Sequence, residues 1–207
     1  MTLLAKVAVT SKAEDRRDAK REAILAGAKD VFLAEGFEGA SMDGVAAKAG
    51  VSKMTVYRHY GSKEALFAGV IDGLCERIVD DDLDQIFARP PHDALRGFAR
   101  KMIEITFAPD TIELHRIVVA ESRRFPKLGK QFYANGPEAC IAALEKYFIR
   151  NKGKSGFRVG DARRSAEEFL ELLRGYAHLR VMLGLDRAPS KRDIEIRIES
   201  AIRHVFG

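Results

Sequence analysis

The sequence predicts an all-α protein: a three-helix head containing a helix-turn-helix, followed by a larger helical body. Apolar residues recur at three- and four-residue spacing along most of the 207 residues, which is the period of a helix packed on one face. Glycine and proline interrupt this pattern often enough to predict about nine helices or more. One stretch near the amino terminus, residues 41–63, has the spacing of two short helices joined by a tight turn.

The tight turn is built by residues with different physical roles. Ser41 and Ser52 are good N-caps, because their hydroxyls accept hydrogen bonds from the first helical N–H groups. Gly50 ends the first helix, since glycine takes the left-handed backbone without a Cβ clash. The small Ala46 lets the two helices approach, and Val56 holds the second helix on the first. This spacing is typical of a helix-turn-helix.

The exposed side of the second helix is predicted to be basic. Residues 41–63 contain four cations, Lys48, Lys53, Arg58 and Lys63, against the single acid Asp43. A short helix that presents many donors suits a phosphate-lined major groove. The alternative is the solvated face of an ordinary helical hairpin, and the spacing and charge together favour DNA binding.

The run AGVSKMTVYRHYGSKEALF resembles the signature of TetR-type transcriptional regulators, and the resemblance covers residues 18–72. In this family a three-helix DNA-binding head precedes a helical body that binds ligand and dimerises. The resemblance implies base reading by Lys53, Met54 and Thr55, with Arg58 on the rim. It implies phosphate contacts from Ser41, Tyr57, His59 and Lys63, and Ser52 at the helix start is included in the DNA-binding set.

Composition and charge are those of an ordinary globular chain. Hydrophobic residues make up 46% and charged residues 31%, and the net charge of +5 permits nucleic-acid binding without requiring it. Cys75 and Cys140 lie far apart and outside any CxxC pattern, which argues against a disulfide framework or a zinc site. No apolar run approaches a membrane span, so we expect no membrane association and a cytoplasmic location.

The head is expected to consist of a basic arm and a three-helix unit. Residues 1–14 are predicted to be a loose arm, either a disordered tail or a segment that reaches along DNA. Residues 15–61 form the DNA-binding domain, and its first helix runs over about residues 15–35 and ends at Gly36. This helix supplies core that two short helices lack on their own.

The body, residues 62–207, is expected to be a series of helices separated by proline and glycine breaks. Ser62 is predicted to cap a connector helix that runs to about Phe87. Asp110 with Glu113 matches a capping box, and residues 135–137, Asn-Gly-Pro, predict a stop and restart. The remaining helices are expected at about residues 92–107, 111–123, 126–133, 138–150, 161–184 and 190–205.

The run LHRIVVAESRRFPKLGKQFYANGPEACIAALEKYF in the body is similar to the AefR-like branch of the same family. Bodies of TetR type hold a small molecule between their middle helices. The pocket candidates are Leu74, Ile78, Phe98, Met102, Ile105, His115, Ile117, Phe132, Ile141 and Leu144, with Glu104 and Glu121 as further polar contacts. Such a wall suits an apolar or amphipathic effector, and ordinary core packing is the alternative for each apolar residue.

The last two helices carry wide apolar stripes and are joined by a short link, which predicts antiparallel neighbours. We expect this pair to meet its copy in a homodimer, because a palindromic operator needs two heads about 34–36 Å apart. The predicted interface residues are Phe169, Leu173, Tyr176, Ile194, Ile198, Ile202 and Val205. The alternative is that both stripes face their own domain.

Motifs of catalysis are absent from the sequence, which contains no GxSxG, HExxH, P-loop or GxGxxG pattern. We expect no catalytic residues, no metal and no cofactor, and we interpret the acidic run at residues 80–84 as a solvated turn. The sequence therefore predicts a ligand-responsive homodimeric regulator that binds a double-stranded DNA operator and is released by a small molecule. Repression is expected and activation stays open. The other alternative is a helical small-molecule-binding protein or enzyme with a vestigial head.

Overall fold

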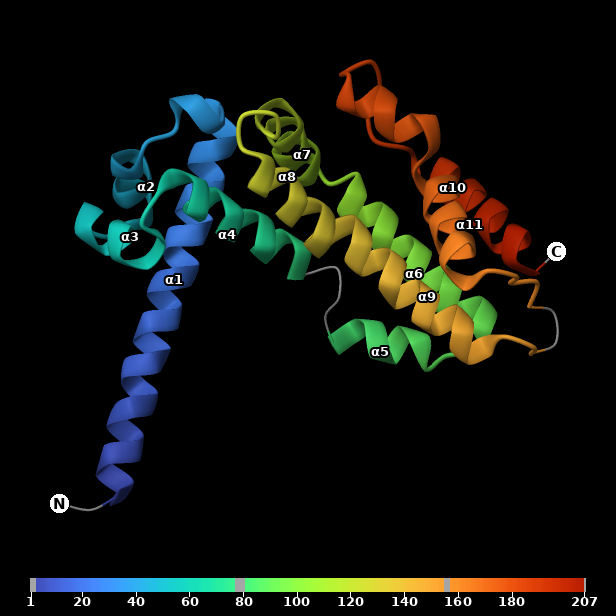
Figure 1. Ribbon diagram of the computed structural model, residues 1–207, viewed down its shortest axis with the longest axis horizontal. Helices are drawn as coiled ribbons and strands as arrows, with labels where there is room; N and C mark the ends of the chain where they lie inside the picture. Colours follow the sequence, from blue (N-terminus) through green and yellow to red (C-terminus); the bar gives the residue numbers. More distant parts are fainter. Residues whose placement is uncertain (1–2, 77–80, 155–156, 207) are drawn as a thin grey trace. The chain divides into compact units, whose positions relative to one another are not determined.

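The structure, a computed structural model, describes residues 3–76, 81–154 and 157–206, with side chains of residues 3–15 and 81 outside the description. The described residues contain helices and no strand. The chain divides into two compact units, which we call the head, Met1–Gly73, and the body, Leu74–Gly207. Figure 1 shows the helices of each unit. The all-α prediction is confirmed.

Eleven α-helices and one π-helix follow one another along the described parts of the chain. They are α1 (Leu3–Gly39), α2 (Met42–Ala49), α3 (Lys53–Tyr60), α4 (Lys63–Glu76), α5 (Asp81–Phe87), α6 (Pro91–Thr106), α7 (Pro109–Glu121), α8 (Pro126–Tyr133), the π-helix η1 (Ala134–Glu138), α9 (Ala139–Asn151), α10 (Ala162–Met182) and α11 (Lys191–Phe206).

The first helix begins much earlier than the sequence pattern suggests. Its backbone is helical from Leu3, whereas residues 1–14 were expected to form a loose arm. Neither glycine nor proline occurs between Leu3 and Ala26, so no residue in this stretch interrupts a helix. Near its other end, Gly36 takes φ of 71°, which breaks the regular helix where the sequence predicts a stop.

The helix-turn-helix is capped as the sequence predicts. The Ser41 hydroxyl accepts a 3.0 Å hydrogen bond from the Gly44 N–H at the start of α2. Gly50 ends α2 in the left-handed region, with φ of 65°. The Ser52 hydroxyl accepts a 3.2 Å hydrogen bond from the Thr55 N–H at the start of α3. These caps satisfy N–H groups that short helices would otherwise leave unpaired.

Three aromatic rings form the centre of the head. The Phe32 and Phe37 rings of α1 are stacked with centroids 5.9 Å apart, and the Phe67 ring of α4 meets them edge-on at 4.7 and 5.4 Å. Because Phe67 and its neighbour Leu66 are fully buried against the head, the early turns of α4 belong to it. The division between the units therefore falls after Gly73, whereas the sequence suggests residue 61.

The connector predicted from Ser62 to Phe87 is described only in part. The Ser62 hydroxyl accepts a 3.1 Å hydrogen bond from the Ala65 N–H, as expected of a cap, and α4 is described as far as Glu76. Helix α5 is described at Asp81–Phe87. The four residues between the two helices lie outside the described part of the chain.

The body is centred on α10, which contacts α6, α9 and α11, and α6 also contacts α11 (Figure 1). Phe98, Phe148 and Phe169 are fully buried there, and the Phe169 ring lies 6.4 Å from each of the other two. Helices α10 and α11 are packed neighbours, as their short link suggests. Salt bridges from Arg96 on α6 to Glu195 and Glu199 add ionic contacts to α11.

Two local predictions in the body are wrong. Helix α7 begins at Pro109 with Ala108 as its N-cap, so Asp110 lies inside the first turn and not at the N-cap position that a capping box with Glu113 requires. Proline at the first helical position lacks an N–H that would need a cap. The stretch around Pro137 was predicted to end one helix and begin another. It instead forms the π-helix η1 between α8 and α9. Such single π turns are frequent at functional sites.

We predict that Phe67→Ala destabilises the head strongly. The substitution removes a fully buried ring that touches two others, and phenylalanine truncations in cores cost about 3–5 kcal/mol. Urea denaturation of the full chain, followed by circular dichroism, measures the loss. The control is Met54→Ala in the same unit, where the side chain is 76% exposed and a change within about 0.5 kcal/mol is expected. Equal effects of the two substitutions would contradict the proposed core.

Candidate functional site

Helix α3 turns one side toward solvent and the other into the head. Val56 is fully buried, whereas Lys53, Met54, Tyr57 and Arg58 are exposed, with 76% of Met54 accessible. An exposed methionine of this degree contributes nothing to the core of the head. The amino-terminal turn and one side of α3 are therefore open to a partner, as the sequence predicts for a recognition helix.

The base-reading candidates already have partners within the head. The Lys53 ammonium donates to a carboxylate oxygen of Asp43 on α2 at 2.8 Å, and this contact raises the pKa of Lys53. The Thr55 and Ser52 hydroxyls lie 2.8 Å apart, and Thr55 is half-buried. Because both pairs are exposed to water, exchanging these contacts for DNA contacts carries a small cost.

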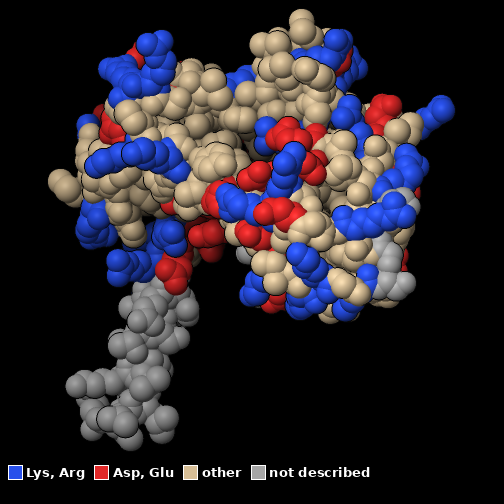
Figure 2. Space-filling view, turned by 45° about the vertical axis from the view of Figure 1, so that its right-hand side comes forward, with Lys and Arg blue, Asp and Glu red and all other residues tan. Residues whose placement is uncertain are grey.

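Basic residues of α1 extend the surface of α3. Burial lowers the pKa of His59, and nearby positive charge lowers it further. The charges responsible are Arg58 on α3 and Arg17, Lys20 and Arg21 on α1. Figure 2 shows blue Lys and Arg side chains over several parts of the head, at the left of the view. The positive surface thus continues from α3 onto α1.

Lys63, predicted to bind a phosphate, has a structural role in the head. Its ammonium donates to the backbone carbonyls of Glu38 and Ala40, both at 3.1 Å, and lies 4.8 Å from the centre of the Phe37 ring. The side chain is half-buried. Lys63 therefore joins the start of α4 to the end of α1. Removing it would disturb the head as well as any phosphate contact.

The body contains a cavity of about 590 Å³, within the range typical of ligand sites. Six predicted residues line it: Leu74, Met102, Ile105, His115, Phe132 and Ile141. Phe98 and Leu144 are instead fully buried core residues, and Ile117, Glu104 and Glu121 are not in the wall. Ile78 lies outside the described residues.

One wall of the cavity was missed by the sequence analysis altogether. Helix α10 contributes six lining residues, which are Glu167, Leu170, Glu171, Leu173, Arg174 and His178. The sequence assigned this helix only to subunit contacts, although its polar residues at 167, 171, 174 and 178 recur at helical spacing. That periodic polar set inside an apolar helix was the available signal.

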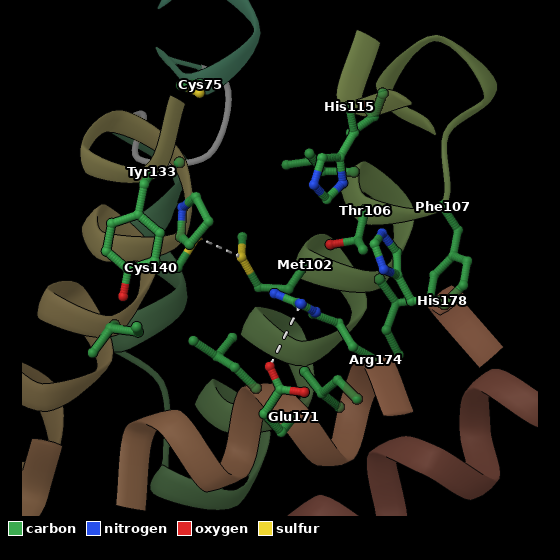
Figure 3. A pocket seen from close by; sticks show the side chains of 18 of the residues that line it. Cys75, Met102, Thr106, Phe107, His115, Tyr133, Cys140, Glu171, Arg174 and His178 are labelled. Atoms are coloured by element: carbon green, nitrogen blue, oxygen red, sulfur yellow. Dashed lines mark hydrogen bonds and ion pairs between the residues drawn. The ribbon is translucent and has the colours of Figure 1, made fainter. Parts of the chain in front are cut away.

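The cavity has a nitrogen-rich side. Figure 3 shows the His115 and His178 rings and the Arg174 guanidinium together on one side, near the Thr106 hydroxyl. The two imidazole rings are 5.4 Å apart. Burial, assisted by the Arg174 charge, lowers the pKa of each histidine to about 4, and His178 adds to the effect on His115. Both rings are therefore neutral near pH 7.

The opposite side of the cavity is apolar and contains sulfur. Cys75, Cys140 and Tyr133 lie there in Figure 3, and Cys140 Sγ is 3.5 Å from Met102 Sδ. Burial, with a smaller effect of Cys75, raises the pKa of the Cys140 thiol to about 12. A thiol that keeps its proton is a poor nucleophile, so this wall is chemically inert packing surface.

Five of the seven predicted subunit-contact residues are buried inside the single chain. Phe169, Leu173, Ile198, Ile202 and Val205 are each at most 2% exposed, so their stripe faces the chain's own core. Ile194 is half-buried, and Tyr176 is 83% exposed. The exposed apolar side chains of this region lie on another face and beyond the end of α10: Leu172, Tyr176, Leu179, Leu183, Leu185 and Ile196.

A glycine kink interrupts α10 directly after Arg174. Gly175 takes φ of 48°, a conformation that breaks the regular helix and that L side chains rarely adopt. The Arg174 carbonyl at the kink accepts a 3.4 Å hydrogen bond from Arg197 on α11. The kink thus lies between Arg174, which lines the cavity, and the exposed Tyr176.

Within the described parts of the chain, no three His, Cys, Asp or Glu side chains come together as metal ligands would. None of the helices in those parts combines the length and apolarity that a bilayer crossing requires.

We predict that His115 and His178 make the body less stable in mild acid. Their pKa values of about 4 in the fold lie below the ordinary 6.5, so the unfolded chain binds more protons as the pH falls from 6.5 to 4. The free energy of unfolding should fall over this range, and less steeply in the double variant H115N/H178N. Urea denaturation at several pH values measures it. His92→Asn, outside the cavity, is the control and should keep the wild-type slope.

Comparison with known proteins supports the division into head and body. The family model of bacterial regulatory proteins of the TetR family matches residues 24–70. The model of the C-terminal domain of AefR-like transcriptional repressors matches residues 93–206, which is more than half of the chain.

Relatives with known names match mainly over the head. The transcriptional activator FasR of Mycolicibacterium smegmatis is 38% identical over 63 residues, covering 30% of this chain and 29% of FasR. The transcriptional regulator AlkX of Mycobacterium tuberculosis is 30% identical over 105 residues, covering 49% of this chain and 50% of AlkX. The chain thus spans half or less of the length of these relatives.

Solved structures match over nearly the whole length. A TetR-family regulator from Mesorhizobium loti has a TM-score of 0.82 at 25% identity, covering 91% of this chain and 96% of the other. The flavonoid-responsive regulator FrrA has a TM-score of 0.70 at 34% identity, covering 89% and 94%. Because the two family models match the head and the body, and α2 and α3 form a capped helix-turn-helix, the chain belongs to the TetR family of transcriptional regulators and carries an AefR-like C-terminal domain.

Proposed function

We propose that the protein is a homodimeric repressor that binds a palindromic operator and leaves it when a small molecule occupies the cavity of the body. The observation that carries the proposal is the exposed amino-terminal turn of α3, with Lys53, Met54 and Thr55, inside a firmly capped helix-turn-helix. Such a turn suits the base edges of a major groove. Around it lie the remaining predicted contacts: Ser41, Ser52, Tyr57, Arg58, His59 and Lys63.

Arg17, Lys20 and Arg21 of α1 add to the proposed DNA surface. Their charges act on His59, which places them next to α3. Positive charge beside a recognition helix raises affinity for any duplex by releasing counterions from phosphates. These residues therefore increase the affinity for any DNA duplex, and the start of α3 determines the preference for the operator sequence.

We propose repression rather than activation because of what the body resembles. The AefR-like match is to transcriptional repressors, and it covers the part of the chain that would respond to a ligand. The similarity to the activator FasR is confined to 63 residues. A ligand can weaken DNA binding only by the difference in its affinity for the DNA-bound and free conformations.

The operator and the sign of regulation are tested together. Genomic fragments selected by the purified full chain should share a palindrome whose half-sites lie about one helical turn apart. A reporter behind such a fragment should be more active when the gene for the protein is deleted. Lower reporter activity after deletion would indicate activation instead. Failure to select any fragment, together with turnover of a small molecule, would favour an enzyme with a vestigial head.

We predict that Arg58→Gln weakens binding to all duplexes and flattens its salt dependence. Each lost phosphate contact lowers the slope of log K against log salt by about 0.9, so a dimer should lose about 1.8. Fluorescence anisotropy with the operator and a scrambled duplex measures both. Thr55→Ala is the matched variant and should reduce the preference for the operator without this change of slope. Arg58 is the better probe because Lys63 also holds the head together.

The proposed dimer uses the exposed apolar face of the last two helices. Leu172, Tyr176 and Leu179 recur at helical spacing on α10 and are 37%, 83% and 50% exposed. Large apolar side chains gathered on an exposed face mark interaction sites. The same surface on a second copy gives a self-complementary two-fold contact.

We predict that Tyr176→Glu dissociates the dimer. A charge in the centre of an apolar interface has no partner there, so the chain should sediment as a monomer in analytical ultracentrifugation. Operator binding should fall at least tenfold, because one head binds one half-site. Ile149→Glu, at a position 61% exposed on α9, is the matched control and should stay dimeric. If the Tyr176→Glu variant stays dimeric, the subunit interface does not include Tyr176, which contradicts the proposed contact.

A further inference from the structure

The cavity of the body contains two buried polar atoms that lack hydrogen-bond partners among the described residues. They are Nε of Arg174 and Oγ1 of Thr111, and both residues line the cavity. Leaving a buried donor unpaired destabilises the protein, and a charged group more than a neutral one. A bound molecule with an oxygen acceptor would remove this cost. The unpaired atoms therefore indicate which chemistry the occupant brings.

The charges around the cavity indicate the sign of that acceptor. Arg174 is the cation of the wall, and its Nη2 lies 3.6 Å from a carboxylate oxygen of Glu171. Glu171 is 66% exposed and Glu167 is also exposed, so water screens both carboxylates. The Arg174 Nε is buried. The inner face of the guanidinium therefore offers an incompletely neutralised positive charge to the cavity.

The two histidines complete a site for an anionic oxygen. Their rings lie beside the guanidinium in Figure 3, together with the Thr106 hydroxyl. A neutral imidazole has one N–H, so His115 and His178 can each donate one hydrogen bond without adding charge. Donors thus outnumber acceptors on this side of the cavity. A neutral alcohol or amine would satisfy fewer of them than an anion with two oxygens.

The remaining wall requires an apolar molecule. Met102, Phe132 and Ile141 line it, and the thiol of Cys140 keeps its proton there. An apolar ligand surface that packs against this wall is removed from water, which favours binding. A small hydrophilic anion would leave most of the 590 Å³ to water and gain nothing from this wall. The occupant must combine an anionic end with an apolar body.

We propose that the cavity binds a carboxylic acid with an apolar aliphatic or aromatic body, its carboxylate on the Arg174 guanidinium and Thr111 hydroxyl. Guanidinium and carboxylate form two parallel hydrogen bonds, and one of them uses Nε. The apolar body lies along Met102, Phe132 and Ile141. This inference rests on the proposed function, because it names the chemical class of the effector.

The position of Arg174 is fixed from outside the cavity. Gly175 begins the kink, and the Arg197 guanidinium donates to the Arg174 carbonyl at 3.4 Å. A backbone held in this way keeps the side chain aimed inward before any ligand arrives, which lowers the ordering cost of binding.

The test measures binding of matched probes to the full chain by isothermal titration calorimetry. Decanoate and 4-phenylbutyrate are the acids, and 1-decanol and methyl decanoate carry a similar body without the charge. At least one acid should bind ten times or more tightly than its neutral counterpart. Arg174→Met keeps the aliphatic stem and should abolish this preference, whereas Arg174→Lys should retain part of it.

The controls separate a local effect from a folding defect. Arg164→Met, an exposed arginine of α10 outside the cavity, should keep the preference for acids. Thr111→Val should weaken acid binding about three- to tenfold and leave 1-decanol unchanged. Equal binding of acids and neutral probes, no binding of either acid, or a preference that survives Arg174→Met would overturn the proposal.

A second measurement tests separately whether the cavity binds carboxylic acids and whether ligand binding releases the operator. Operator binding is measured with and without the tightest probe. An acid that binds through Arg174 but leaves the operator complex intact supports the site and contradicts effector release. A neutral probe that releases the operator through the cavity supports the regulator and contradicts the carboxylate class.

Discussion

The head depends on the contact of three phenylalanine rings. Helices α2 and α3 have eight residues each, too few for a stable helix in water, so their shape depends on packing of α2 against α1 and of α3 against α2. Gly36 makes this possible, because its positive φ turns the chain so that Phe37 returns beside Phe32. Phe67 then closes the cluster from α4. The cluster thus joins α1 to α4, and α3 is attached to α1 through α2.

The body concentrates its functions on α10. Residues two positions apart on a helix are turned by about 200°, so Leu172 and Arg174 point in nearly opposite directions. One of them is part of the exposed apolar face and the other lines the cavity. The Gly175 kink gives α10 a discrete bend directly after Arg174. A ligand that alters the cavity side of α10 would therefore act on the same rigid piece that carries the proposed subunit contact.

The helix-turn-helix was largely predictable from the sequence, and the cavity only in part. Caps and turns depend on residues that are neighbours in the chain, so Ser41, Gly50 and Ser52 could be assigned directly. Whether an apolar residue faces a cavity, the core or water depends on helices that are distant in sequence. Hence Met102 and Phe132 line the cavity as expected, while Phe98 turned out to be core.

The sequence by itself determined the helical class, the helix-turn-helix, the basic side of α3 and the family, because each follows from local spacing and residue type. Only the tertiary structure decided which face of α10 meets solvent and that Lys63 binds the Glu38 and Ala40 carbonyls. It also brought the charge of Arg174 together with two neutral histidines. These features depend on contacts between elements far apart in the chain. Hydrophobic periodicity predicts that a helix has an apolar face, but it does not predict which element packs against that face.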